Sequence, residues 1–123
     1  MFSDADNADS FDILSYSLGK FTNLTNLTLP WQPNVTSLEK CAKLPNLCKM
    51  KRLTLIQIPA IIPPTDVAAF INQHFEDNGF MCLSFLIQTT ESYREKIKSL
   101  INSKKFQLRI EFKPADAGFV LRP

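Results

Sequence analysis

Glycine is scarce in this sequence: there are three among 123 residues, and each stands alone. A loop that cradles a phosphate needs several closely spaced glycines, because they let the backbone come close to the phosphate oxygens. Gly19, Gly79 and Gly118 can form neither such a loop nor a dinucleotide-binding fingerprint. The sequence therefore excludes the common classes of nucleotide-dependent enzyme.

Histidine and cysteine are equally rare. His74 is the single histidine, and it lies on the apolar side of a predicted helix, where a packed structural residue is expected. Cys41, Cys48 and Cys82 lack the paired spacing of a zinc site, and none has a base and an orienting group beside it. We therefore expect no metal, no cofactor and no catalytic residue. An odd number of cysteines at irregular spacing indicates reduced, buried thiols and an intracellular, reducing compartment, either cytoplasm or an organellar matrix.

Long apolar runs and a strong net charge are also missing. No stretch approaches the roughly 20 apolar residues that a membrane-spanning helix needs, so we expect no membrane span. The formal net charge of +2 creates no field that would draw the whole chain to nucleic acid or anionic lipid. The first twelve residues contain four aspartates and no basic residue, unlike a secretory or organelle-targeting leader.

The composition that remains is that of one folded domain. A hydrophobic fraction of 45%, with ten phenylalanines, is enough to fill a single core. We expect a mobile acidic segment over residues 1–10, an α/β domain over 11–112 and a tail over 113–123. Within the domain, apolar periodicity predicts helices and strands in strict alternation. The expected helices cover 11–20, 37–44, 65–79 and 91–103, and the expected strands cover 24–29, 51–58, 80–87 and 106–112.

The helix ends carry recognisable capping residues. Gly19 and the pair Asn78-Gly79 are expected to end the first and third helices. Thr36 or Ser37 is expected to cap the start of the second helix, and Thr65 that of the third. Because a helix separates each pair of consecutive strands, we expect right-handed crossovers and a parallel sheet, either open and doubly wound or a solenoid.

The predicted strands share a short leucine pattern. The spacing L-x-x-L-x-L recurs at offsets of 26 and 30 residues, in Leu24, Leu27 and Leu29, in Met50, Leu53 and Leu55, and in Phe80, Leu83 and Phe85. A fourth copy keeps Leu108 and Ile110 but has Lys105 at its first position. With the run LGKFTNLTNLTLP over residues 18 to 30, the pattern resembles the leucine-rich repeat family, particularly its ribonuclease-inhibitor-like and F-box-associated types.

The resemblance implies a short solenoid with parallel strands and with helices on the outer face, in which neighbouring repeats bury each other's apolar residues. The family usually places Asn or Cys three positions after the last leucine. Gln32, Ile58 and Gln88 stand there in this sequence, so the repeats are degenerate. Whether further repeats stack on either end stays open.

A non-catalytic interaction role fits these observations best. We expect a protein–protein interaction module, working as an adaptor or subunit of a larger complex. Loops that leave the strands of a solenoid line one rim, and an aromatic residue there is a typical anchor for a partner, although Trp31 could equally fold back over the sheet. The candidate contacts on this rim are Trp31, Gln57, Ile61 and Ile62.

The C-terminal tail offers a second candidate contact, formed by Phe119, Val120 and Leu121. Two other functions stay open as alternatives. One is a small open-sheet ligand-binding or enzymatic domain that uses its topological switch point. The other is an RNA-binding accessory subunit, which would use basic side chains and bind in a salt-dependent way. The basic residues concerned are Lys40, Lys43, Lys49, Lys51 and Arg52.

Overall fold

A computed structural model describes residues 12–20, 25–45 and 49–114 of the chain. Helices and strands alternate along these residues, as the sequence predicts. The helices are α2 (Ile13–Lys20), α3 (Leu38–Ala42), α4 (Pro64–His74) and α5 (Glu91–Leu100). The strands are β1 (Asn26–Pro30), β2 (Met50–Ile58), β3 (Phe75–Phe85) and β4 (Gln107–Phe112).

The strands form one open sheet in the order β1-β2-β3-β4, and every neighbouring pair is parallel. One helix connects each strand to the next. The predicted α/β class and parallel sheet are therefore confirmed. The sheet runs in sequence order without reversal, so consecutive strands always lie side by side.

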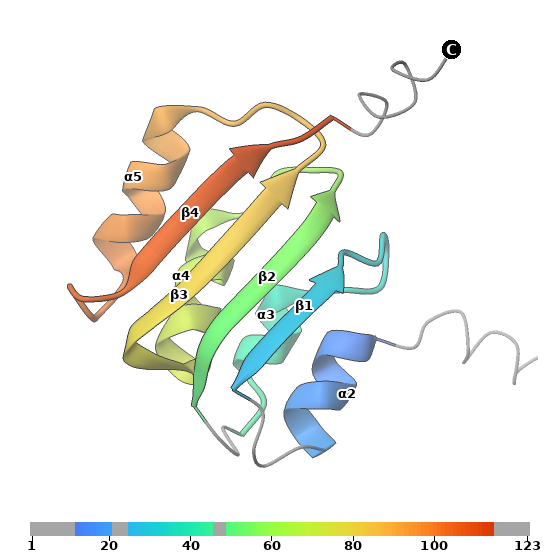
Figure 1. Cartoon of the computed structure of the whole chain (residues 1–123), viewed down its shortest axis with the longest axis vertical. Helices are drawn as coiled ribbons and strands as arrows, with labels where there is room; N and C mark the ends of the chain where they lie inside the picture. Colours follow the sequence, from blue (N-terminus) through green and yellow to red (C-terminus); the bar gives the residue numbers. More distant parts are fainter. Residues whose placement is uncertain (1–11, 21–24, 46–48, 115–123) are drawn as a thin grey trace, which may run out of the picture.

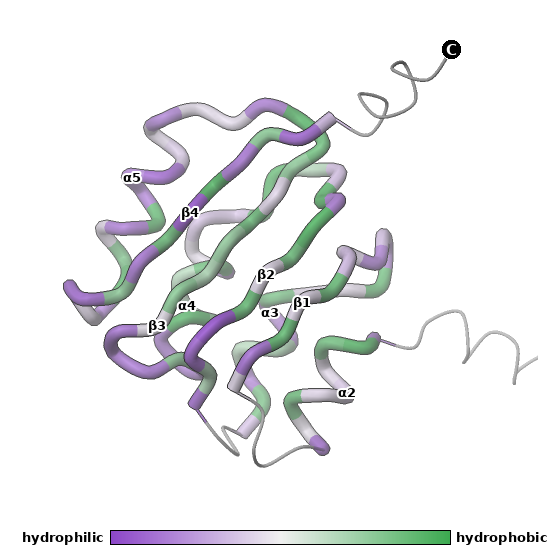
Figure 2. Tube along the Cα trace, in the orientation of Figure 1, coloured by the Kyte–Doolittle hydropathy of each residue, from purple (hydrophilic) through white to green (hydrophobic). Residues whose placement is uncertain are grey.

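Figure 1 shows α3 and α4 behind the sheet, α2 and α5 beyond its two edges, and no helix of the described residues on its other face. Side chains alternate between these two faces along each strand. Leu53 and Leu55 of β2 point to the helices and are fully buried, whereas Thr54 between them lies on the uncovered face. The same alternation is visible in Figure 2 as changes of hydropathy along β4. One core between the sheet and the helices therefore holds the described residues together.

The register of the sheet corrects the predicted repeat. Leu27, Leu53, Met81 and Leu108 lie side by side across the four strands, at intervals of 26, 28 and 27 residues. The leucine pattern predicts Leu83 opposite Leu53, which is two residues further along the chain than the observed partner, Met81. A shift of two residues leaves every side chain on the same face of the sheet, so a leucine pattern does not distinguish the two alignments. The observed intervals are more regular than the predicted ones.

The starts of two helices test the predicted caps. Ser37 caps α3, because its Oγ accepts a hydrogen bond from the backbone N–H of Lys40 at 3.2 Å. Thr65 does not cap α4, and that prediction is wrong. Helix α4 starts one residue earlier, at Pro64, and Pro63 precedes it without a side-chain cap. Proline favours the first helical position because its fixed φ already suits a helix and no N–H is lost there.

Neither glycine ends a helix as predicted, although α2 does end at residue 20, as expected. Gly19 lies inside the last turn of α2 and not after it. Helix α4 ends at His74, and Gly79 lies within β3. The strand starts early because Phe75 enters the core, where its ring packs edge-on against Phe106 at 5.0 Å between centroids. A Cβ atom on Gly79 would lie 2.9 Å from Cδ2 of Phe75, so glycine there makes room for this aromatic pair.

Candidate functional site

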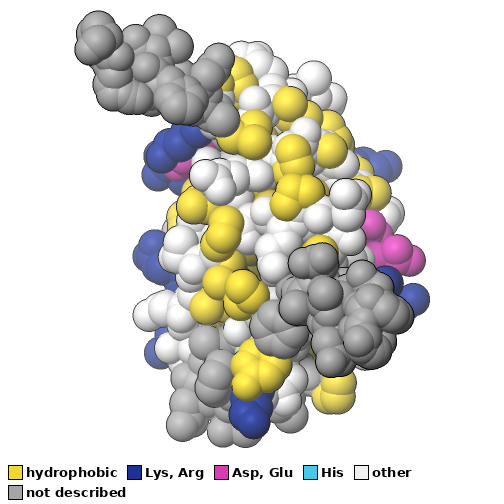
Figure 3. Space-filling model, turned by 90° about the vertical axis from the view of Figure 1, so that its right-hand side faces the viewer, with side chains coloured by type: hydrophobic (Ala, Val, Ile, Leu, Met, Phe, Trp, Pro, Cys, Tyr) yellow, Lys and Arg dark blue, Asp and Glu magenta, His cyan; other side chains and the backbone are white. Residues whose placement is uncertain are grey.

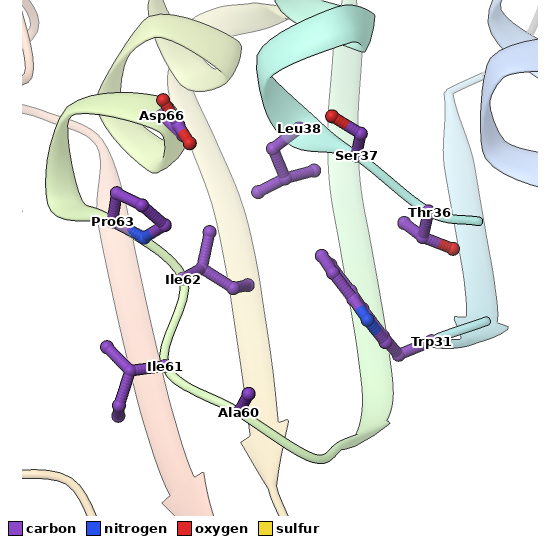
Figure 4. A pocket seen from close by; sticks show the side chains of 9 residues that line it. All are labelled: Trp31, Thr36, Ser37, Leu38, Ala60, Ile61, Ile62, Pro63 and Asp66. Atoms are coloured by element: carbon purple, nitrogen blue, oxygen red, sulfur yellow. The ribbon is translucent and has the colours of Figure 1, made fainter. Parts of the chain in front are cut away.

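The candidate site lies at the carboxyl ends of β1 and β2. Because the strands are parallel, the loops that leave them meet at one edge of the sheet. Between the two loops and the starts of α3 and α4 lies a hollow of about 200 Å³ (Figure 4). Its lining residues are Trp31, Thr36, Ser37, Leu38, Ala60, Ile61, Ile62, Pro63 and Asp66. The structure thus brings together three of the four residues that the sequence predicts on this rim.

Trp31 is fixed directly after β1. Its backbone N–H donates to the carbonyl oxygen of Ile56 at 2.8 Å and so extends the ladder between β1 and β2. The indole is partly exposed, packs against the core and points into the hollow (Figure 4). Within the described residues, no acceptor is hydrogen-bonded to its Nε1–H. Trp31 therefore covers the end of the core, and its Nε1–H has no acceptor among the residues that the structure describes.

The opposite wall of the hollow is the loop between β2 and α4. The side chain of Ile61 is 47% exposed, whereas that of Ile62 is only 5% exposed and belongs to the core. Ile62 therefore supports the wall and offers a partner almost no surface of its own. Tyr93 of α5 donates its hydroxyl to the carbonyl oxygen of Ile62 at 2.6 Å, and burial raises the pKa of this hydroxyl to about 12. The bond holds the loop in place.

The polar groups of the hollow differ in how well they are satisfied. The hydroxyl of Thr36 accepts the backbone N–H of Gln32 at 3.0 Å, and that of Ser37 caps α3. Within the described part of the chain, no donor is bonded to the Asp66 carboxylate, which lies in the first turn of α4. Desolvation, and then the nearby Glu39 carboxylate, raise the pKa of Asp66, while Lys43 lowers it.

Gln57, the fourth predicted rim residue, lies outside this hollow. It has a φ of 58° at a bulge in β2, where the register with β3 shifts between Leu55 and Ile58. The extra residue lets both Leu55 and Ile58 point into the core. Gln57 lines a separate hollow of about 320 Å³ together with Ile56, Ser84, Leu86, Lys113 and Pro114. The second predicted contact, Phe119, Val120 and Leu121, lies outside the described residues.

Sequence reasoning missed the uncovered face of the sheet. Arg52 stacks over the ring of Phe80, with 4.6 Å from its guanidinium carbon to the ring centroid. On β4, Glu111 forms ion pairs with Arg109 at 2.9 Å and with Lys113 beyond the strand end at 3.3 Å. These cations lower the pKa of Glu111 despite some desolvation. Period-two alternation of Arg109, Glu111 and Lys113 is the signal that could have indicated this polar row.

His74 and Cys41 are the residue types that could act as a base and a nucleophile, but both have structural roles here. His74 is 1% exposed, and its Nε2 bonds to the backbone carbonyl oxygen of Cys41 at 2.7 Å, not to the thiol. Burial lowers the pKa of His74. The Cys41 thiol contacts Asp12 at 3.9 Å, and burial, reinforced by that carboxylate, raises its pKa to about 12. Such a thiol is a poor nucleophile at neutral pH.

Cys82 is likewise buried, and desolvation and Glu111 raise the pKa of its thiol. No group of three or more metal-binding side chains occurs among the residues that the structure describes. In the same residues, no helix is both long and apolar enough to cross a membrane.

Comparison of the chain with protein-family models, with curated proteins and with solved structures finds no match. The leucine-rich repeat resemblance therefore stays a prediction.

Proposed function

We propose that this protein is a non-catalytic protein-binding module, an adaptor or subunit of a larger complex, that holds its partner at the carboxyl-end rim of the sheet. The observation that carries the proposal is the hollow that Trp31 lines from one loop and the β2–α4 loop lines from the other, with the exposed side chain of Ile61 on the outer side of that loop (Figure 4). Aromatic anchors beside a hollow are the usual centre of a protein interface. At about 200 Å³ the hollow is smaller than the roughly 300–1,000 Å³ of small-molecule sites, and it suits a single side chain better than a cofactor.

The surface around the rim supports this assignment. Figure 3 views the molecule from the side of β1 and shows hydrophobic side chains gathered along that side. Ile13 and Tyr16 of α2 are 37% and 44% exposed. Exposed large hydrophobic side chains gathered on one side of a molecule are typical of a protein interface.

The sheet geometry supports the finer proposal of a leucine-rich-repeat-like solenoid. The register repeats at 26, 28 and 27 residues, within the range of that repeat class. Helices pack about 8–10 Å apart and strands about 4.8 Å, so a helix layer with one helix per strand is wider than its sheet. Helices α2 and α5 accordingly lie beyond the two edges of the sheet in Figure 1. We infer that longer arrays of such units would curve with the helices outside.

An enzymatic or ligand-binding role has less support. Open α/β sheets bind ligands where the strand order reverses, because the loops separate there and leave a crevice. The order β1-β2-β3-β4 contains no reversal. The buried His74 and Cys41 are also engaged in packing and in bonds to the backbone or to Asp12.

An RNA-binding role has less support as well, because the predicted basic cluster does not form one surface. Lys40 belongs to α3 in the helix layer, whereas Arg52 lies on the uncovered sheet face over Phe80. The Phe80 ring on that face is therefore already covered by a guanidinium and is not free for a base.

The test compares two hydrophobic residues of similar exposure at the same end of the sheet. Ile61 beside the hollow is 47% exposed, and Phe112, at the end of the opposite edge strand β4, is 44% exposed. The full chain and its variants Ile61→Ser and Phe112→Ser are used to purify partners from the source cells. The recovered protein is then purified and titrated against each variant by light scattering and calorimetry.

The proposal predicts a stoichiometric complex that Ile61→Ser weakens about tenfold or more and that Phe112→Ser leaves within twofold, as expected for a central contact. Equal affinities for the two variants would place the interface elsewhere and refute the rim assignment. Salt-dependent retention of all variants on RNA, with no protein partner, would favour the RNA-binding alternative.

A further inference from the structure

The chemistry of the hollow defines the kind of segment that fits it, and this inference rests on the proposed protein-binding function. Its lining includes the partly exposed apolar side chain of Trp31 and the almost fully buried side chains of Leu38 and Ile62 (Figure 4). Both hydroxyls that line it are already used within the protein, that of Thr36 by the Gln32 N–H and that of Ser37 as a helix cap. Each hydroxyl is thus fixed as an acceptor of a backbone N–H, and its own O–H is left to donate.

Two polar groups of the hollow are not used in this way. Among the described residues, no acceptor is bonded to Nε1–H of Trp31, and no donor to the Asp66 carboxylate. The first group is a neutral donor, which suits a carbonyl oxygen of a partner backbone. The second is an anion in a partly desolvated position, which suits an ammonium or guanidinium group.

The charges around Asp66 make a cation the preferred neighbour. Glu39 is close enough to act on the Asp66 carboxylate with the same sign. Lys43 is the nearby cation, but it forms no ion pair with Asp66 within the described part of the chain, where the pairs found are those of Glu111. A partner's Lys or Arg at this edge would therefore meet the Asp66 carboxylate, which has no ion pair among the described residues, and would also be attracted by the nearby Glu39.

We propose that the hollow between Trp31 and the β2–α4 loop binds a short segment of a partner protein in which an apolar side chain stands next to a Lys or Arg. The apolar side chain fills the hollow against the indole. Its backbone carbonyl accepts the Trp31 N–H, and the neighbouring cation pairs with Asp66. An acidic or purely apolar segment would lack the last contact.

The experiment selects random peptides displayed on phage against the full chain, and then measures the selected peptides in solution. Trp31 is the only tryptophan, so its fluorescence reports binding at the hollow directly. Each peptide is titrated against the wild type, Asp66→Asn and Glu91→Gln. Glu91 is the matched control, because it is an acidic residue in the first turn of another helix. Thermal melting verifies that each variant folds.

We expect the selected peptides to be enriched in an apolar residue within three positions of Lys or Arg. Asp66→Asn should weaken their binding about two- to fivefold, as for a partly exposed ion pair, and Glu91→Gln should not. Replacing the peptide's basic residue by Ala should weaken binding to the wild type but not to Asp66→Asn. Salt should weaken binding to the wild type more than to Asp66→Asn.

The outcomes separate this inference from the function on which it rests. The inference would be overturned, and the rim function left intact, if the selected peptides changed Trp31 fluorescence but were not enriched in Lys or Arg. Such peptides would bind Asp66→Asn as tightly as the wild type. Peptides that bind without any change in Trp31 fluorescence would overturn the inference too. Loss of the rim function itself would be seen separately, as equal binding of a protein partner to Ile61→Ser and Phe112→Ser.

Discussion

His74 is the buried group whose replacement tests the packing of α4 on α3 most sharply. Its Nε2 lies 2.7 Å from the carbonyl oxygen of Cys41, and its ring packs on Phe70 at 5.1 Å. A carbonyl oxygen only accepts, so the neutral ring carries its proton on Nε2. His74→Phe keeps a planar ring and removes this donor. The Cys41 oxygen still accepts the Leu44 N–H at 3.1 Å, so no orphaned acceptor is left.

The expected loss is therefore that of one net hydrogen bond, about 1 kcal/mol at pH 7.5. The pH dependence gives a second, independent signature. Burial lowers the pKa of His74 in the folded protein below its unfolded value of 6.5. Just below pH 6.5, His74 therefore binds a proton in the unfolded chain but stays neutral in the folded chain. The stabilising contribution of neutral His74 is fully present above pH 6.5 and is lost as the pH falls toward the folded pKa. The loss amounts to at most about 1.4 kcal/mol per pH unit.

Urea denaturation at pH 7.5 and at pH 5.5, followed by circular dichroism, measures both effects. Wild type should be about 1 kcal/mol more stable than His74→Phe at pH 7.5, and this advantage should shrink or reverse at pH 5.5. An identical stability difference at the two pH values would show that His74 is not held neutral and buried, and would refute this reasoning.

Two further predictions concern packing around the core. In urea denaturation, Gly79→Ala should destabilise the protein by about 1–3 kcal/mol, because the added Cβ would lie 2.9 Å from Phe75. Gly19→Ala should stabilise the protein by about 0.4–1 kcal/mol, because no atom lies within 4 Å of its added Cβ. If both substitutions changed the free energy of unfolding in the same direction, the close packing described at Gly79 would be contradicted. Tyr93→Phe should destabilise the protein by about 1–3 kcal/mol, because it leaves the buried carbonyl of Ile62 without the 2.6 Å hydrogen bond. A melting temperature equal to that of the wild type would show that this bond does not hold the loop in place.

The alternation of elements could be predicted from the sequence because the apolar periodicity is strong. The stripe of α4, with Val67, Phe70 and Ile71, and the alternation of Leu53 and Leu55 in β2 are both fully buried in the structure. The end of α4 could not be predicted, since it depends on contacts distant in sequence. Gly79 resembles a helix stop locally, but its role is set by the approach of Phe106 from another element.

The candidate site could be predicted in part. Trp31 and Ile61 follow strands, and the parallel topology brings their loops together at one edge. The burial of Ile62 could not be predicted, because it depends on Tyr93 reaching its carbonyl from α5. Gln57 was predicted beside Trp31, yet the bulge in β2 directs it to another hollow. That no described residue donates a hydrogen bond to the Asp66 carboxylate is visible only once its neighbours are placed.

The measurement that tests the central claim most directly is the nuclear magnetic resonance signal of the indole N–H, since Trp31 is the only tryptophan and gives a single indole peak. A partner protein recovered with the wild-type chain is titrated into ¹⁵N-labelled protein. The account predicts that the indole peak shifts together with the backbone amides of residues 60–62 and 66, while the amides of β4 stay in place. A partner that binds tightly, leaves the indole peak unmoved and shifts only β4 or the uncovered sheet face would contradict the claim.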